Sequence, residues 1–174
     1  MTPQNVKFTA DVKEPLILFT IGGQVNNLLK VYKWFYIAWN YLAMIRWLGK
    51  HPESGYLNGH LYMRVFPFGM LLMSYWRSWD DLEQFARFKE GTHLKTWVRY
   101  IHNADPSMAI WHETYVIEPG KFEVVYGTSM PYGLSKATGA IPVQGQQHNG
   151  RGRLNPDDTS VSEEPLIPIP DAFL

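Results

Sequence analysis

The spacing of hydrophobic and polar residues changes several times along the chain, and each change predicts a new element. Residues 16–21 form an unbroken β-rich apolar run that ends at two glycines, which is typical of a buried strand. From 28 to 48 the apolar residues recur every three or four positions, as on a helix, until 51–55 supplies breaking residues. Residues 57–65 then alternate in polarity, and the apolar run 70–76 follows a short turn. The last two runs predict a β-hairpin.

The second half of the chain again has helical spacing followed by strand spacing. Ser78 and Asp81 have the separation of a capping box, which predicts the start of a helix. A further helical piece is expected over 94–101, because its apolar residues share one helical face. Residues 108–117 predict a strand, and 122–126 predict its hairpin partner across a tight turn.

The expected order is therefore strand, helix, strand, strand, helix pair and strand. This is the ferredoxin-like arrangement of an α+β protein, in which an antiparallel sheet carries helices on one face. The other face must also be covered, and a homodimer that stacks two such sheets is the simplest solution. We expect this domain to comprise residues 1–134. Residues 135–174 are rich in glycine and proline, which predicts an extended C-terminal tail.

Composition limits the classes of protein to which the chain can belong. Of its 174 residues, 45% are hydrophobic and 18% are charged, which is enough apolar material for a packed core. Basic and acidic residues are equal in number, which argues against a nucleic-acid partner, because phosphate binding shows as excess lysine and arginine. The absence of cysteine excludes disulfides, thiolate catalysis and cysteine-bound metals. Aromatic residues reach 15%, which suits either an apolar pocket or a ring-rich core.

Two further features concern location. The first residues show no basic start followed by an apolar run, so we expect no secretory signal and a cytoplasmic protein. The most apolar run, 34–45, is shorter than the roughly 20 residues that a membrane span needs, and it contains Asn40. We expect a buried helix and no stable membrane span, with an amphipathic surface anchor as the alternative.

The densest polar string falls inside the last expected strand. Alternation places Trp111, Glu113 and Tyr115 on one face of this strand and His112 on the other, among apolar neighbours. His112 is a candidate base, hydrogen-bond donor or ligand between sheet and helices, or else a core histidine with a backbone partner. Glu113 is a candidate catalytic carboxylate, or the partner of Arg64 or Arg77 at a dimer interface. A register error of one residue would exchange the two roles.

Other candidates lie on the hairpin and on the second helical piece. His60 and Arg64 share one face of the strand 57–65, where they would bind a carboxylate or an enolate oxygen. An ordinary solvent-facing strand gives the same alternation. The remaining candidates would line a ligand cavity, although core packing or an exposed helix start explains each equally well; they are Tyr75, Trp76, His93 and Trp97.

Motifs for metals and nucleotides are missing from the sequence. The six histidines show no paired spacing of a zinc site, so we expect no bound metal. Gly22-Gly23 lacks the remaining residues of a dinucleotide-binding or phosphate-binding loop. Neither observation points to a cofactor.

With these motifs in place, the chain resembles a fungal and bacterial family named for an ABM-type monooxygenase of the fumagillin pathway. The resemblance runs from about Leu16 to Leu134, and its most specific part is Trp111-His112-Glu113-Thr114-Tyr115. Its other residues are Tyr75-Trp76-Arg77-Ser78, Leu82, Phe85-Ala86-Arg87, His93-Leu94, Trp97, Gly120, Glu123, Tyr126-Gly127, Met130-Pro131 and Gly133-Leu134. The resemblance implies a ferredoxin-like protomer of the dimeric α+β barrel superfamily, a homodimer, and an oxygenase of lipophilic secondary metabolites.

The activity that the resemblance implies is a cofactor-independent monooxygenase, in which a deprotonated, electron-rich substrate reacts with oxygen directly. Such an enzyme needs a base, a group that stabilises a negative oxygen, and a dry aromatic cavity. We expect His112 or Glu113 to move the proton and His60 or Arg64 to stabilise the oxygen. The expected cavity residues are Tyr75, Trp76, His93, Trp97, Trp111 and Tyr115.

Three alternatives stay open at this point. A cyclase or isomerase of the same lipophilic compounds would need only a shaped cavity and proton transfer. The superfamily also contains haem-dependent enzymes, for which His112 or His93 would be the axial ligand. A non-catalytic binding module would use the same pocket without any reaction, since a fold does not determine a function.

Overall fold

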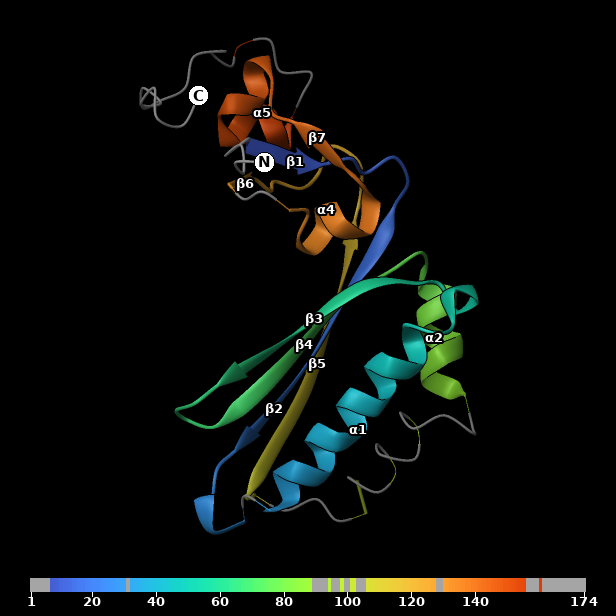
Figure 1. The fold of residues 1–174 in the computed structure, drawn as a ribbon, viewed down its shortest axis with the longest axis vertical. Coiled ribbons are helices and arrows are strands. Elements are labelled where there is room, and N and C mark those ends of the chain that lie inside the picture. The colour runs from blue at the N-terminus through green and yellow to red at the C-terminus, as the bar shows by residue number, and fades with distance from the viewer. Residues whose placement is uncertain are drawn as a thin grey trace. The chain divides into compact units, whose positions relative to one another are not determined.

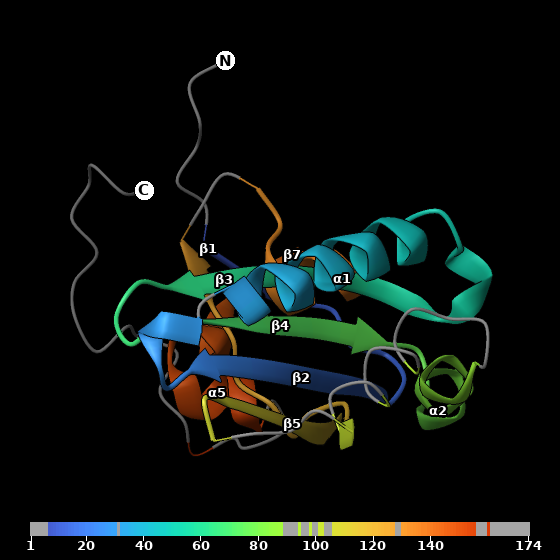
Figure 2. The ribbon, with the colours of Figure 1, turned by 90° about the horizontal axis from the view of Figure 1, so that it is seen from below.

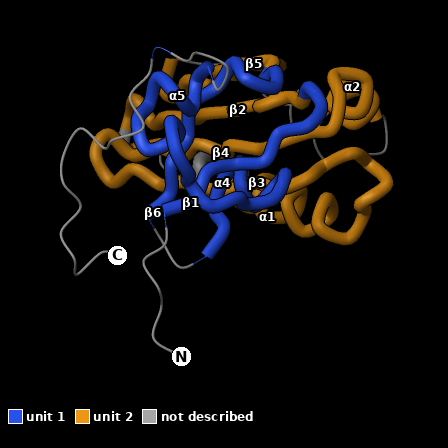
Figure 3. The backbone as a smooth tube through the Cα atoms, turned by 90° about the horizontal axis from the view of Figure 1, so that it is seen from above, with its two compact units in different colours: residues 1–15, 117–174 blue, residues 16–116 orange. Residues whose placement is uncertain are grey.

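The coordinates come from a computed structural model of the chain, drawn in Figure 1. The structure describes residues 7–30, 32–88, 94, 98, 101–102, 106–127, 130–155 and 160. The chain forms two compact units, one of residues 1–15 and 117–174 and the other of residues 16–116 (Figure 3). We call the second of these the larger unit, and the first the smaller unit.

The larger unit contains a four-stranded sheet in the order β3-β4-β2-β5. Its strands are β2 (Leu16–Val25), β3 (Tyr56–Arg64), β4 (Gly69–Trp76) and β5 (Met108–Ile117). Strand β4 pairs antiparallel with both β2 and β3. This strand order, with a helix between β2 and β3, is the ferredoxin-like α+β fold, and the predicted fold class is confirmed.

Helix α1 (Tyr32–Leu48) covers one face of this sheet, as Figure 2 shows. We call that face the helix face and the opposite one the far face. The hydrophobic core of the larger unit lies on the helix face, to which each strand contributes side chains from alternate positions. Its buried residues are Ile17, Ile21, Val25, Tyr41, Met44, Leu48, Met70, Leu72, Trp76, Leu82, Phe85 and Met108.

Helix α2 (Trp79–Arg87) begins at the predicted capping position. The Ser78 hydroxyl accepts a hydrogen bond from the Asp81 amide at 3.1 Å, and the Asp81 carboxylate accepts two from Arg77 at 2.7 and 2.9 Å. These Arg77 hydrogen bonds hold the pKa of the Asp81 carboxyl below its usual value. Gly55, with φ of 78°, lies against the same carboxylate, and a Cβ at this position would be 2.3 Å from Asp81 Cγ. Only glycine fits there.

The second helical piece and the strand after it are also found where the pattern places them. Of the piece predicted over 94–101, the described residues Leu94, Val98 and Ile101 are helical. Strand β5 has the predicted bounds, and the turn after it forms, since the Lys121 amide donates to the Glu118 carbonyl at 3.0 Å.

The smaller unit contains a three-stranded sheet that the sequence pattern does not predict. Its strands are β1 (Lys7–Ala10), β6 (Tyr126–Gly127) and β7 (Ala140–Pro142), in the order β6-β1-β7. The predicted hairpin between β5 and residues 122–126 is wrong, because Tyr126 and Gly127 pair with β1 instead. The extended segment before β6 is held to β1 by the Thr9 hydroxyl, which donates to the Val124 carbonyl at 2.8 Å.

Residues 135–155 differ from the extended tail that the composition predicts. They include most of α4 (Gly133–Thr138), then β7, a 3-10 turn η3 (Gly145–His148) and α5 (Gly150–Leu154). The predicted domain boundary at residue 134 therefore falls inside α4. Elements this short show no hydrophobic period, and local caps hold them, such as the Asn149 side chain that accepts from the Gly152 amide at 2.8 Å.

Candidate functional site

The alternation predicted for β5 is present in the structure. The His112 ring lies 5.8 Å from the ring of Phe19, which packs against the core, so His112 is on the helix face. The Trp111 ring lies on the far face, directly over Gly22. A Cβ on Gly22 would be 2.3 Å from Trp111 Cζ2, so this glycine leaves the space that the indole fills. Neighbouring side chains of β5 therefore point to opposite faces of the sheet.

His112 occupies the margin of the helix face rather than its interior. Its side chain is exposed, whereas Phe19 beside it and Ile110 two residues earlier are half-buried and pack on the core. Thr114, two residues further along β5, points to the same face and is half-buried. The alternative of a buried core histidine is thus wrong. His112 lies beside the apolar side chains of Phe19 and Ile110 and is exposed to solvent.

The far face carries the other polar candidates, in pairs. Arg64 Nη2 donates to Gln24 Oε1 across Gly69, which lies between them in the strand register and has no side chain. The ring Nε2 of His60 lies 3.1 Å from Asn58 Nδ2, within hydrogen-bond distance. Both candidates therefore lie on the far face of β3, His60 in the middle of the strand and Arg64 at its end.

Glu113 and Tyr115 form a third pair on the far face. The Tyr115 hydroxyl donates to Glu113 Oε2 at 2.7 Å, and both side chains are exposed. This hydrogen bond raises the pKa of the Tyr115 hydroxyl, because losing the proton would break the bond and leave two negative oxygens in contact. The partner of Glu113 in the chain is therefore a phenol.

The predicted set of site residues divides between the two faces of the sheet. Trp76 is on the helix face and is 1% exposed, with its Nε1 donating to Ser74 Oγ at 3.0 Å, so it is a core residue rather than a cavity wall. Far-face candidates are His60, Arg64, Tyr75, Trp111, Glu113 and Tyr115. One cavity within a single chain that joins His112 to His60 or Arg64 is excluded, because the sheet lies between them. His93 and Trp97 lie outside the described residues.

The described part of the chain contains no cluster of three or more histidine, cysteine, aspartate or glutamate side chains that could hold a metal ion. None of the described helices is both long enough and apolar enough to cross a membrane. The groups described at the candidate site on the helix face are the His112 imidazole, the Thr114 hydroxyl and the Phe19 ring.

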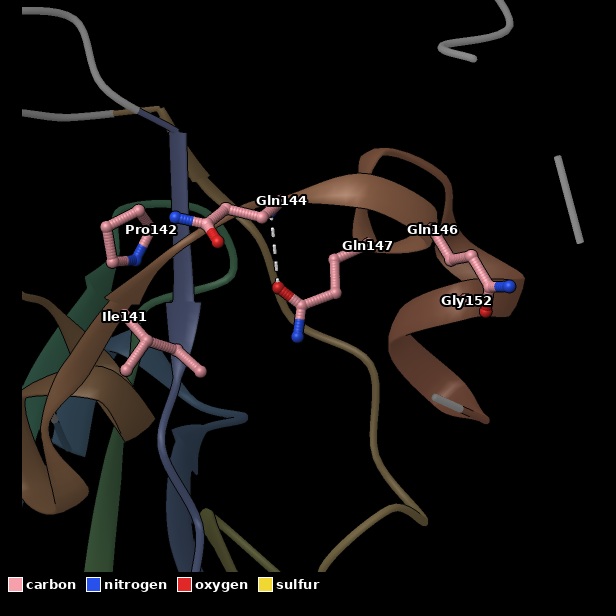
Figure 4. A pocket seen from close by; sticks show the side chains of 6 residues that line it. All are labelled: Ile141, Pro142, Gln144, Gln146, Gln147 and Gly152. Atoms are coloured by element: carbon pink, nitrogen blue, oxygen red, sulfur yellow. Dashed lines mark hydrogen bonds between the residues drawn. The ribbon is translucent and has the colours of Figure 1, made fainter. Parts of the chain in front are cut away.

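A hollow of about 510 Å³ in the smaller unit was not predicted, because the pattern indicated a tail there. Figure 4 shows its lining residues, which are Ile141, Pro142, Gln144, Gln146, Gln147 and Gly152. The backbone N–H of Gln144 donates a hydrogen bond to Gln147 Oε1 at 3.3 Å, which joins two of these lining residues. Amides and apolar groups without an acid or base do not support proton transfer, so we do not assign the reaction to this hollow.

The fold and the site define a ferredoxin-like α+β protein with a histidine at the margin of its helix face. Residues 16–134 match the family model described as Monooxygenase af470-like, which covers more than half of the chain. The chain therefore belongs to the monooxygenase af470-like family.

Solved structures are similar to the chain at low sequence identity, and curated proteins gave no match. An aldoxime dehydratase, OxdRE, in complex with butyraldoxime is 14% identical with a TM-score of 0.54, covering 67% of this chain and 35% of the dehydratase. This chain thus spans about a third of that enzyme's length, and the likeness shows the fold alone.

Two further structures are similar. A dimeric ferredoxin-like protein from an uncultured marine organism is 12% identical (TM-score 0.45), with 60% of this chain and 96% of that chain covered. SnoaB, a cofactor-independent oxygenase from Streptomyces nogalater, was solved as a mutant and is 10% identical (TM-score 0.40), with 57% and 90% covered.

Proposed function

We propose that the protein is a cofactor-independent monooxygenase that oxidises a small lipophilic substrate of secondary metabolism with molecular oxygen. Membership of a monooxygenase-like family supports the class of reaction. The observation that carries the site is the position of His112 on the helix face, exposed to solvent and beside the ring of Phe19. We further propose a cytoplasmic enzyme on the fumagillin-pathway branch of its family.

The reaction begins when the His112 imidazole removes a proton from an acidic CH2 carbon of the substrate, one conjugated with a carbonyl group. The resulting carbanion transfers its electrons to O2, and a new C–O bond forms as a peroxide, which regains the proton from His112. Elimination of water, formed from the distal hydroxyl of the peroxide and the second hydrogen of that carbon, then leaves a ketone. One oxygen atom ends in the product and the other in water, so no external reductant is required.

Thr114 replaces Arg64 and His60 as the group that stabilises the negative oxygen. Side chains two residues apart on a strand share a face and lie about 7 Å from each other, which leaves room for a reacting carbon and its oxygen between them. A hydroxyl donor aimed at an enolate or peroxide oxygen lowers the barrier most where water is excluded. Thr114 is half-buried, and a substrate seated between Thr114 and His112 would displace the water around both side chains.

The proposal is tested with dithranol, an enolisable anthrone, as the probe under ¹⁸O₂. We expect a product that has gained one ¹⁸O atom and lost two hydrogens, measured by mass spectrometry. General-base assistance contributes about 10²- to 10⁴-fold, so His112→Ala should lose about that factor in kcat. His60→Ala, a histidine change on the far face, is the matched control and should keep full activity.

Each other outcome has a defined meaning. A product of unchanged mass would replace the oxygenase by an isomerase or cyclase. An undiminished rate in His112→Ala would remove this residue from the mechanism. A third outcome is that dithranol binds to the parent and to His112→Ala, but neither forms a product or takes up oxygen. This outcome would contradict an oxygenase and favour a binding module.

Cofactor independence is part of the proposal and has its own test. Freshly purified protein should show no Soret band, and its dithranol turnover should survive dialysis against a chelator. A Soret band that disappears in His112→Ala would overturn this part of the proposal and assign His112 as a haem ligand.

We also propose that the far face pairs with the far face of a second copy. The support is a set of exposed rings on that face, among them Tyr62, Trp111 and Tyr115. Exposed apolar surface of this kind marks an interaction site, and face-to-face stacking would cover it in both copies. In such a dimer the polar pairs of the far face would meet their counterparts. Sedimentation at micromolar concentration should give the mass of two chains.

A further inference from the structure

Helix α1 carries an exposed apolar stripe in addition to the side that packs into the core. Tyr32, Phe35 and Trp39 are 64%, 62% and 68% exposed, and Leu42 continues the same line. The steps of three, four and three residues place all four side chains on one face of the helix. The stripe extends for about 15 Å, at 1.5 Å per residue.

This stripe is distinct from the surface that anchors α1 to the sheet. Tyr41, Met44 and Leu48 point into the core of the larger unit and are 2–6% exposed. At 100° per residue, their side of the helix lies well away from the stripe. The helix is therefore apolar in two directions, and packing against the sheet explains only one of them.

The segment that contains the stripe carries charges of only one sign, and Arg46 and Lys50 are the basic residues on the side of the stripe. The segment 28–50 contains four basic residues, Lys30, Lys33, Arg46 and Lys50, and no acidic residue. The whole chain has equal numbers of acidic and basic residues, so the rest of the chain carries the balancing four negative charges. Arg46 lies one turn beyond Leu42 on the line of the stripe, and both Arg46 and Lys50 are exposed.

We propose that α1 docks the protein onto the surface of an anionic lipid bilayer, with the helix parallel to the membrane plane. Tyrosine, tryptophan and phenylalanine on one face, with basic residues beside them, are the combination that enters the boundary between headgroups and acyl chains. The basic residues would face anionic headgroups such as phosphatidylserine. Binding of this kind is peripheral and reversible, because no described helix spans a membrane.

A second copy of the chain is a poorer occupant for the stripe. Two copies packed stripe to stripe would bring Arg46 and Lys50 of both copies close together, and segment 28–50 contains no acidic residue to balance them. An anionic surface instead complements both the rings and the charge. This inference does not depend on the proposed reaction, although a bilayer would also concentrate a lipophilic substrate near the enzyme.

The test is flotation of the full chain with vesicles of phosphatidylcholine containing phosphatidylserine, compared with vesicles of phosphatidylcholine alone. We expect flotation with the anionic vesicles, and its loss in high salt or without phosphatidylserine. The double variant Phe35→Ser/Trp39→Ser should bind at least about tenfold more weakly, because two rings no longer leave water. Arg46→Glu/Lys50→Glu should lose the preference for phosphatidylserine.

The matched control is Val65→Ser/Phe66→Ser, which removes two side chains that are 83% and 84% exposed in the turn between β3 and β4. It should float like the parent. Failure of the parent to float, or equal weakening by the control, would overturn the proposal. Loss of dimer mass in Phe35→Ser/Trp39→Ser with no change in flotation would show that a second copy covers the stripe instead. Circular dichroism establishes that each variant is folded.

Discussion

The two faces of the four-stranded sheet differ in what they hold. The helix face is filled by the core, in which Leu72 and Trp76 are almost completely buried, and His112 lies exposed at its margin. On the far face, polar pairs lie between exposed rings, including the Tyr115–Glu113 pair. One strand, β5, supplies both faces with consecutive residues. Adjacent residues in the sequence can therefore belong to separate functions, because a strand sends them in opposite directions.

The strongest way to test this difference is to remove one indole from each face. Trp76→Ala should lower the free energy of unfolding by about 3–5 kcal/mol, because it leaves a cavity in a packed core. Trp111→Ala should lower it by about 1 kcal/mol or less, because that ring is 41% exposed. Urea unfolding at a protein concentration where both proteins have the same oligomeric state measures the two values. Equal losses would contradict the assignment of core and surface.

A charge on the far face should act on association rather than on folding. Trp111→Glu would place an unpaired carboxylate inside the proposed dimer, so the dissociation constant should rise by at least about a hundredfold. Val65→Glu adds the same charge in an exposed turn and serves as the control. Sedimentation equilibrium gives both constants. An unchanged constant for Trp111→Glu would show that this face is not the interface.

Acid should lower the stability of the helix side of the larger unit more than that of the far face, because the cap of α2 contains an ionised carboxylate. The pKa of Asp81 is lower in the folded protein than in the unfolded chain. The contribution of this carboxylate to the free energy of unfolding is therefore complete above the unfolded pKa, and it is lost as the pH falls through the folded pKa. Asp81→Asn should lower the free energy of unfolding by about 1 kcal/mol at neutral pH, and the difference from the parent should shrink below about pH 4.

Glu83→Gln is the control for this cap. It removes an exposed ion pair with Arg87 on the same helix, and the expected loss is about 0.3 kcal/mol. Urea titrations over a range of pH values measure both variants. A difference between Asp81→Asn and the parent that grows in acid would contradict the sign of the shift.

The smallest expected effect concerns the far face. Glu113→Gln removes the negative charge beside the Tyr115 hydroxyl, so the pKa of that hydroxyl should fall toward its ordinary value, with stability unchanged. NMR titration of tyrosine labelled with ¹³C at the ζ carbon follows this group directly. Glu118→Gln, which removes the partner of Lys121, should leave the Tyr115 titration unaltered.

The elements of the larger unit could be predicted from the sequence because each is long enough to show its own period. The helix 28–48, the β3–β4 hairpin and the Ser78 cap depend on residues close together in the chain. The strands of the smaller unit depend on pairing between β1 and segments more than a hundred residues away, which no local pattern reveals.

The candidate site was predicted only in part, for a related physical reason. Alternation gives the relative faces of His112 and Glu113, and the structure agrees. Alternation also puts His60 and Arg64 on one face of β3, as the structure has it, but it does not relate that face to the face of His112, because the register between strands is set by the fold. The sequence pattern therefore groups His60 and Arg64 with His112 in one site, whereas the sheet separates them.

The central claim is that the helix face binds the substrate and the far face pairs with a second copy. Its most direct test is a crystal structure of the protein with dithranol, from crystals grown without oxygen so that the probe is not consumed. We predict dithranol on the helix face, in contact with the rings of His112 and Phe19, and two copies stacked through their far faces. Dithranol bound between the far faces, against His60 or Glu113, would contradict the account.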